Sequence, residues 1–133
     1  MTNSVLIADD SEAIRRSLRN LFSKHSDLTI CGEAEDGCQA VEQARKLHPD
    51  LILLDFSMPN MNGLEAASQL KGLSPGVPIV MLTMFKDKFL EDRAYKAGIS
   101  LVLSKEENMA RVADYARILL KPDTPRDGLR LGK

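Results

Sequence analysis

The sequence predicts an α/β fold: a doubly wound, three-layer α/β/α sandwich around one sheet of five parallel strands, built from five successive βα units. Short apolar runs alternate with amphipathic stretches along the chain. Strands that alternate with helices form parallel sheets, because parallel neighbours need crossover connections. The runs also lack polar alternation, as in Leu51–Leu54, which is expected of strands covered on both faces. Because such crossovers are right-handed, we expect helices on both faces of the sheet.

The first three βα units combine apolar runs with stripes of helical spacing. Strands are expected at 4–8, 28–33 and 50–54. The stripes that follow them are Ile14, Leu18, Leu21 and Phe22, then Val41, Ala44 and Leu47, and then Leu64, Ala67 and Leu70. Ser11 is a candidate N-cap of the first helix, Asp36-Gly37 precedes the second, and Asn62-Gly63 precedes the third.

The last two units are followed by a polar tail. Strands are expected at 77–82 and 100–103. The fourth stripe is Phe89, Arg93 and Ala97, ended by Gly98, and the fifth is Met109, Val112, Ala113, Ala116, Leu119 and Leu120, stopped by Pro122. We therefore expect one domain over residues 1–121. Residues 122–133 are interpreted as a disordered tail or a linker remnant, because their prolines, glycines and charges leave little to bury.

The composition excludes several classes of function. With 18 Lys and Arg against 19 Asp and Glu, the net charge is −1, which gives no drive toward nucleic acid or anionic lipid. We expect no direct nucleic-acid binding by this chain, because too few residues follow the fifth helix for a helix-turn-helix. No apolar run approaches the ~20 residues that span a membrane. Cys31 and Cys38 are interpreted as reduced thiols, and the protein as cytoplasmic.

Polar side chains stand at the carboxyl ends of four of the expected strands. Asp9 and Asp10 close the first apolar run, Asp55 the third, Thr83 the fourth and Lys105 the fifth. If these strands are parallel neighbours, the five side chains meet at one edge of the sheet. Ligand chemistry in doubly wound sheets collects beyond that edge.

The residue types at this edge suit phosphoryl chemistry. Converging carboxylates raise one another's pKa or recruit a cation, and an all-oxygen ligand set favours Mg²⁺. A metal beside Asp55 would orient this carboxylate and clamp a phosphoryl group, and a carboxylate can act as the nucleophile that forms an aspartyl phosphate. The ammonium of Lys105 would pair with one phosphoryl oxygen, and Thr83 would donate a hydrogen bond to another. The sequence therefore predicts reversible phosphorylation of Asp55.

Taken in order, these motifs closely resemble the receiver domains of two-component response regulators. The matching elements are Asp9-Asp10, Asp55 with Met58-Pro59 and Asn62-Gly63, Leu82-Thr83, Ala97-Gly98 and Lys105. Each piece is common by itself, but the ordered set is specific, and it covers nearly the whole chain. The resemblance implies a flavodoxin-like fold. The sequence around Met58-Pro59 is similar to that of receivers that precede a DNA-binding domain, so the chain is either a fragment of a transcription regulator or a stand-alone regulator.

The resemblance also implies how the metal would be held. Asp55 would be the phosphoacceptor. Asp10 would ligate Mg²⁺ directly, and Asp9 would act mainly through a metal-bound water. The backbone carbonyl of Ser57 would complete the protein ligands.

For the switch itself, the resemblance implies two further residues and a donor. Lys105 would pair with the phosphoryl group or with Asp55, and Thr83 would move toward the phosphate and pull its loop along. The donor would be a phosphohistidine on a sensor histidine kinase or a phosphotransfer protein. Phosphorylation would change a partner-binding surface, and a homodimer is allowed.

Two positions depart from the family pattern. Val102 stands where the family usually has Tyr or Phe, which puts the usual coupling between the threonine and an aromatic ring in doubt. Glu106 follows Lys105 where a cis proline is often found, so we expect a trans bond, since a cis non-proline bond costs about 3–4 kcal/mol. Ser57 and Phe85 are expected to flank the path of the hydrolysing water, with the bulk of Phe85 extending the lifetime of the phosphate.

Two other functions stay open at this point. A phosphatase with an Asp nucleophile usually needs a second acid two residues later, and here that position is Ser57. A receiver that only docks, without being phosphorylated, is kept open by Val102. We expect the switched receiver rather than an enzyme.

Overall fold

A single sheet of parallel strands organises the computed structural model, which describes residues 2–121. The strands lie in the order β2-β1-β3-β4-β5. Their bounds are β1 (Asn3–Ala8), β2 (Leu28–Ala34), β3 (Leu51–Asp55), β4 (Ile79–Thr83) and β5 (Leu101–Ser104). All four pairings are parallel, and β1 pairs with β2 through one register shift between Val5 and Leu6.

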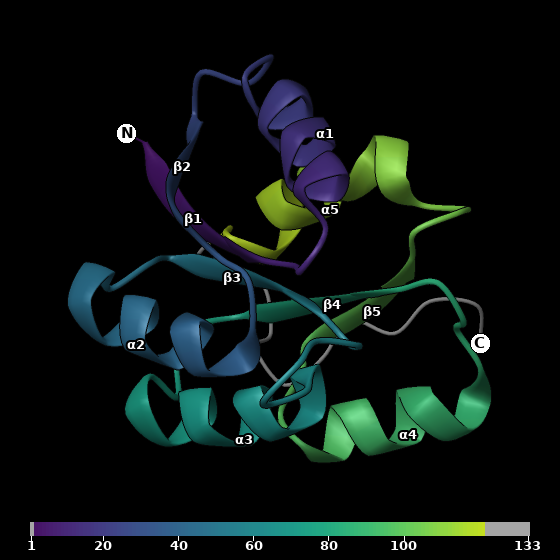
Figure 1. Ribbon diagram of the computed structural model, residues 1–133. Coiled ribbons are helices and arrows are strands. Elements are labelled where there is room, and N and C mark those ends of the chain that lie inside the picture. Colours follow the sequence, from purple (N-terminus) through teal and green to yellow (C-terminus); the bar gives the residue numbers. More distant parts are fainter. Residues whose placement is uncertain (1, 122–133) are drawn as a thin grey trace.

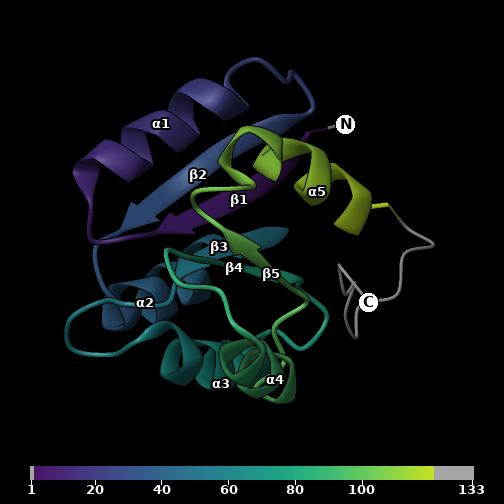
Figure 2. The same cartoon turned by 90° about the vertical axis from the view of Figure 1, so that its right-hand side faces the viewer.

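Helices cover both faces of this sheet. They are α1 (Glu12–Phe22), α2 (Gly37–Leu47), α3 (Gly63–Leu73), α4 (Lys88–Lys96) and α5 (Val112–Leu119). Helices α1 and α5 lie on one face, and α2, α3 and α4 lie on the other (Figures 1 and 2). The predicted fold class, five βα units in a flavodoxin-like sandwich, is confirmed.

The core has two halves, one on each side of the sheet. Successive strand residues point to opposite faces, so Ile52 and Leu54 pack toward α2 and α3, whereas Leu51 and Leu53 pack toward α1 and α5. Every residue of β3, β4 and β5 is buried. The unbroken apolar runs of the sequence therefore reflect strands that have no solvent-facing side.

Side-chain caps fix where four of the helices begin. Ser11 accepts a hydrogen bond from the backbone N–H of Ile14, as predicted, and Asp36 and Asp87 cap α2 and α4 in the same way. Asn62 caps α3 in a reciprocal pair with Glu65. These caps lie at the same edge of the sheet as the carboxyl ends of the strands, so they also shape the loops there.

Several predicted boundaries shift by one or two residues. The fourth strand begins at Ile79 rather than at residue 77, because the backbone N–H of Val77 is used in a turn with Ser74 and Pro78 has none. The last helix starts with a 3-10 turn over Met109–Arg111 and becomes α5 at Val112.

The predicted stripe of the fourth helix was wrong. Helix α4 buries Leu90 and Ala94, whereas Phe89 is 72% exposed. The Arg93 guanidinium instead lies over the Phe89 ring, 5.5 Å from its centroid. The period of the pattern was right, but its phase was one residue off, because Phe89 is apolar without being in the core.

Three other expectations concern single features. Cys31 and Cys38 are both free thiols, and all described peptide bonds are trans, including the bond that follows Lys105. Within residues 2–121, no helix is long and apolar enough to cross a bilayer. The expected tail over 122–133 lies outside the described residues.

Candidate functional site

The parallel order of the strands brings the five predicted site residues to one edge of the sheet. Asp55 and Thr83 are the last residues of β3 and β4, Asp9 and Asp10 follow β1, and Lys105 follows β5. Because β1, β3, β4 and β5 are consecutive neighbours, these side chains converge although they lie up to 96 positions apart in sequence.

Three carboxylates form the floor of the site. One oxygen from each of Asp9, Asp10 and Asp55 lies within 4.8 Å of the other two. Asp9 and Asp55 are buried, at 1% and 5% exposed, whereas Asp10 is exposed. Acids held this close repel one another unless a cation offsets their charge.

Lys105 supplies one positive charge to this floor. Its Nζ lies 2.7 Å from Oδ2 of Asp9 and 3.1 Å from Oδ1 of Asp55, and its side chain is 8% exposed. Burial alone would lower the pKa of Lys105, but the two carboxylates outweigh it and raise that pKa. One ammonium against three carboxylates leaves a charge of −2, which a divalent cation would balance.

Asp55 shows the effect of this excess negative charge. Burial raises the pKa of Asp55 most and the charge of Asp9 raises it as well, and the net result is a pKa of about 6. Lys105 opposes both effects without cancelling them. Asp55 is therefore a carboxylate at neutral pH, but one that binds a proton or a cation more readily than an ordinary aspartate.

The donor atoms fit a hard cation such as Mg²⁺. Oδ2 of Asp9 is buried, and although it lies close to Lys105, it makes no aligned hydrogen bond within the described residues. Its partner oxygen Oδ1 accepts from the backbone N–H of Ser11 at 2.9 Å. Oxygen ligands from carboxylates and backbone carbonyls are those that Mg²⁺ prefers. Ser57, whose carbonyl was predicted as a ligand, lines a cavity together with Asp10 and Asp55.

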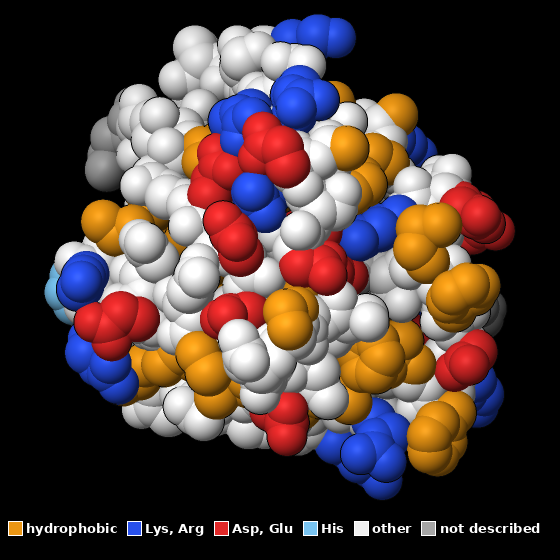
Figure 3. Space-filling model, in the orientation of Figure 1, with side chains coloured by type: hydrophobic (Ala, Val, Ile, Leu, Met, Phe, Trp, Pro, Cys, Tyr) orange, Lys and Arg blue, Asp and Glu red, His pale blue; other side chains and the backbone are white. Residues whose placement is uncertain are grey.

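A cavity of about 720 Å³ opens from the acids toward α4. Asp10, Asp55, Thr83 and Lys105 line its polar end. The rest of its lining is mostly apolar, with Phe56, Leu64, Met84, Phe85, Phe89 and Leu90, but it also includes the charged side chains of Asp87 and Arg93. Hydrophobic side chains are exposed over the region of α4 and the loop before it, on the right of Figure 3.

Thr83 connects the polar end of this cavity to the loop before α4. The threonine is 4% exposed, and its Oγ1 accepts a hydrogen bond of 3.2 Å from the backbone N–H of Phe85. The Phe85 ring is 83% exposed. Val102 is fully buried on β5. The cavity that Thr83 lines is bordered by large side chains of this loop and of α4, those of Met84, Phe85, Phe89 and Leu90.

The loop that follows Asp55 is attached to α2. Asn60, at a positive φ of 69°, donates from Nδ2 to Oδ2 of Asp36 at 2.8 Å. The backbone N–H of Gly37 donates to the carbonyl of Met61 at 3.1 Å. A Cβ at Gly37 would lie 2.3 Å from that carbonyl oxygen, so only glycine fits.

Sequence reasoning missed this attachment and also missed Arg15, which contacts Asp9. Asp36-Gly37 could be seen only as a helix start, because no local pattern indicates that a cap will also bind a loop 24 positions away. Arg15 stands beside Arg16 in the sequence, and nothing separates the buried arginine from the exposed one except the phase of the helix.

Comparisons with known proteins agree with this geometry. The sequence model of the response regulator receiver domain family matches residues 5–117. The response regulator protein VraR of Staphylococcus aureus is 37% identical over 117 residues, which are 88% of this chain and 56% of VraR. The chain thus spans little more than half the length of that relative.

Solved structures share the fold. The response regulator domain of Thermotoga maritima CheB has a TM-score of 0.81 at 28% identity and covers 90% of this chain and 94% of its own. The CheX–CheY–BeF3–Mg²⁺ complex from Borrelia burgdorferi has a TM-score of 0.83 at 23% identity, with 90% of each chain covered, which shows likeness of fold alone.

Proposed function

The chain belongs to the family of response regulator receiver domains of two-component systems, and from that premise we propose that it is switched by phosphorylation of Asp55 in a Mg²⁺-dependent reaction. One observation carries the proposal. Asp55 is a buried carboxylate with a raised pKa, and it shares a single ammonium, that of Lys105, with a second buried acid. Such a site attracts a cation and presents a nucleophile together.

Asp55 is the nucleophile in this proposal. A carboxylate oxygen of Asp55 forms a bond to phosphorus while the bond from phosphorus to the donor imidazole breaks, and the imidazole keeps the electron pair and takes up a proton. With its pKa at about 6, Asp55 is mostly ionised at neutral pH, which the attack requires. Lys105 lies close enough to stabilise the negative charge on the transferred group.

The remaining residues hold the cation and respond to the phosphoryl group. Asp10, Asp9 through a water, Asp55 and the carbonyl of Ser57 would hold Mg²⁺. When bound, Mg²⁺ would offset the carboxylate charge and bind an oxygen of the incoming group. The Borrelia burgdorferi complex, which contains BeF3 and Mg²⁺, supports the choice of ion. The Thr83 hydroxyl would donate a hydrogen bond to the phosphoryl group and release the hydrogen bond that it accepts from the backbone N–H of Phe85.

The partners follow from the same chemistry. We propose that the phosphoryl donor is a phosphohistidine on a sensor histidine kinase or a phosphotransfer protein. The matched segment is 56% of the length of VraR, so an output domain after the receiver is proposed for a longer parent protein, with a stand-alone regulator as the alternative. Three further expectations stay predictions: a homodimer, the absence of nucleic-acid binding by this chain, and a cytoplasmic location.

Phosphorylation can be tested with acetyl phosphate as a small donor. We expect the intact mass to rise by one phosphoryl group in Mg²⁺ but not in EDTA, and Asp55→Asn to abolish the change. Asp92→Asn, which removes an exposed carboxylate of α4, is the control and should label like the wild type. Labelling that survives Asp55→Asn would remove the assignment.

A phosphatase stays the less supported function. The position two residues after Asp55 is Ser57, which has no carboxyl group to act as the acid and base. Sustained hydrolysis of a generic phosphate ester would favour the phosphatase. Failure of the protein to bind Mg²⁺ in a calorimetric titration would instead favour a receiver that only docks.

A further inference from the structure

One buried arginine lies directly behind the acidic turn. Arg15, on the first turn of α1, is 8% exposed, although its neighbour Arg16 has a side chain that is 61% exposed. Transferring a guanidinium out of water is unfavourable unless its N–H groups are bonded and its charge is offset. The contacts that compensate Arg15 therefore indicate what its burial achieves.

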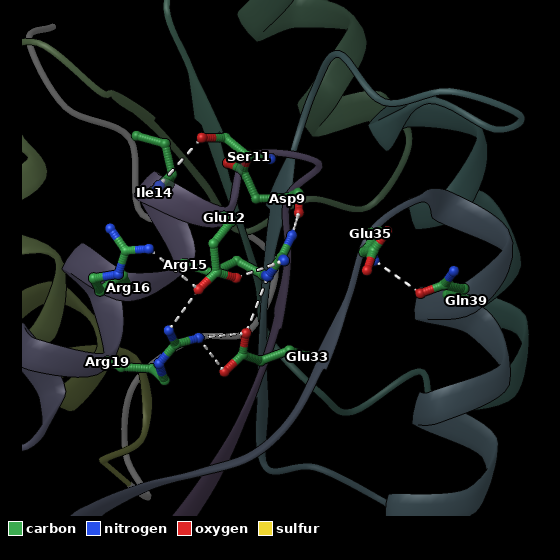
Figure 4. Close-up of polar contacts among 10 residues, drawn as sticks. All are labelled: Asp9, Ser11, Glu12, Ile14, Arg15, Arg16, Arg19, Glu33, Glu35 and Gln39. Carbon is green, nitrogen blue, oxygen red and sulfur yellow. Dashed lines mark hydrogen bonds and ion pairs between the residues drawn. The ribbon is translucent and has the colours of Figure 1, made fainter.

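Each nitrogen of the guanidinium has a different partner (Figure 4). Nη1 donates to the backbone carbonyl of Asp9. Nη2 donates to Oε1 of Glu12 at 2.8 Å, and Nε donates to Oε1 of Glu33 at 3.0 Å. A single planar group thus joins the turn after β1, the start of α1 and the edge strand β2.

The charge of Arg15 is balanced without the site acids. Arg19 donates to both oxygens of Glu33 at 2.7 Å and to Oε2 of Glu12 at 2.9 Å, which closes a ring of two arginines and two glutamates. Of the two arginines, Arg15 is the one that reaches the main chain of Asp9 (Figure 4). The two therefore share the same glutamates but differ in this contact.

The turn that Arg15 holds carries two of the three site acids. The backbone N–H of Asp9 donates to Ala34 on β2 at 3.0 Å, and its side chain accepts from Ser11. With the carbonyl of Asp9 held by Arg15, the N–H, the carbonyl and one carboxylate oxygen of this residue are all fixed. Oδ2 of Asp9 then points to Lys105, and Asp10 follows in the chain.

We propose that Arg15 is a positioning residue, which holds the Asp9 carbonyl so that Asp9 and Asp10 are preorganised to bind a divalent cation. This proposal rests on the proposed function, because it concerns the Mg²⁺ affinity of that site. Groups that orient metal ligands from outside typically change metal affinity by 10–100-fold when removed.

The sign of the effect separates positioning from plain charge. Arg15 is a cation near a cation site, so if it acted only through its charge, its removal would strengthen Mg²⁺ binding. If it acts by holding the turn, its removal weakens binding. We expect Arg15→Met to raise the dissociation constant for Mg²⁺ about tenfold. Methionine keeps the length and helix propensity of the side chain.

Two matched variants control for the surroundings. Arg19→Met removes the same charge from the same two glutamates but leaves the Asp9 carbonyl bonded. Arg16→Met removes an exposed arginine whose ion pair with Glu12 is 3.7 Å long. Both should bind Mg²⁺ within about twofold of the wild type, as expected of changes that leave the ligands in place.

The experiment has two readouts on the full chain. Mg²⁺ affinity is measured by calorimetry, and the exchange rate of the Ser11 amide, which reports the turn, is measured by NMR in EDTA. In Arg15→Met we expect weaker Mg²⁺ binding and faster exchange of this amide. Both should be near wild-type values in Arg19→Met.

Each outcome decides the proposal. Unchanged or tighter Mg²⁺ binding in Arg15→Met, or equal weakening in Arg19→Met, would overturn it. If Arg15→Met does not fold, Arg15→Lys decides, because an ammonium keeps the charge but cannot span three partners; wild-type Mg²⁺ affinity in that variant would overturn the proposal. A wild-type protein that binds no Mg²⁺ would overturn both this proposal and the metal assignment, and it would be seen before any variant is made.

Discussion

Asp55→Asn should stabilise the folded protein at neutral pH when no divalent ion is present. The ordinary pKa of an aspartate is 3.8, and burial with the charge of Asp9 raises that of Asp55 to about 6 in the folded state. The folded protein thus binds a proton on Asp55 more tightly than the unfolded chain does. Above pH 6 this proton is lost, and a buried carboxylate is left in an excess of negative charge.

The sign and size of the effect follow from proton linkage. Between pH 3.8 and about 6 the folded state holds more protons, so the free energy of unfolding falls as the pH rises. A difference of about two pKa units corresponds to about 3 kcal/mol. The variant has no such titration. Its advantage over the wild type should therefore be near zero at pH 4 and should reach at most about 3 kcal/mol at pH 7.

Urea denaturation in EDTA at a series of pH values would measure this difference. Asp92→Asn serves as the control and should show no pH-dependent difference from the wild type, because Asp92 is exposed and its ion pair with Lys88 is 3.8 Å long. Added Mg²⁺ should stabilise the wild type and reduce the advantage of Asp55→Asn. An advantage that does not change with pH, or a variant less stable than the wild type at pH 7, would refute the reasoning.

Two further predictions concern the loops beside the site. Gly37→Ala should destabilise the protein by roughly 1–3 kcal/mol, because the added Cβ would overlap the Met61 carbonyl. Gly72→Ala, in open space on α3, should be neutral or stabilising. Thermal unfolding of the two variants would check this, and equal midpoints would argue against a tight contact at Gly37. Phe85→Ala should shorten the lifetime of the phosphorylated protein about threefold, or about 0.7 kcal/mol in the barrier, and an unaltered decay rate would count against a shielding role for this ring.

The sequence predicted the fold well because its signals were local and redundant. Apolar runs without polar alternation indicated strands buried on both faces, and the structure buries all of β3, β4 and β5. The convergence of Asp9, Asp55 and Lys105 followed from topology alone, because parallel neighbours end at one edge. Their roles in phosphorylation stay predictions, whereas their proximity is a feature of the fold.

What could not be predicted depends on contacts between distant segments. Arg15 and Arg16 differ locally only in the phase of the helix, and the contact of Arg15 with Glu33 on β2 joins two segments that no local pattern relates. The contact between Asn60 and Asp36 needs two loops to meet, which no periodicity encodes. Phe89 misled the pattern because an exposed aromatic side chain has the same composition signal as a buried one.

The two loops beside the site, one after Asp55 and one after β4, are held in place by different numbers of hydrogen bonds. The segment after Asp55 is fastened to α2 by the Asn60 and Met61 contacts, whereas the segment after β4 begins with one hydrogen bond from Phe85 to the Thr83 hydroxyl. Any event that draws that hydroxyl away gives up the second attachment and leaves the first intact. The loop before α4 would then move while the loop next to α2 stays in place. A protein that contacts α4 would therefore sense phosphorylation, and one that contacts α2 would meet the same surface in either state.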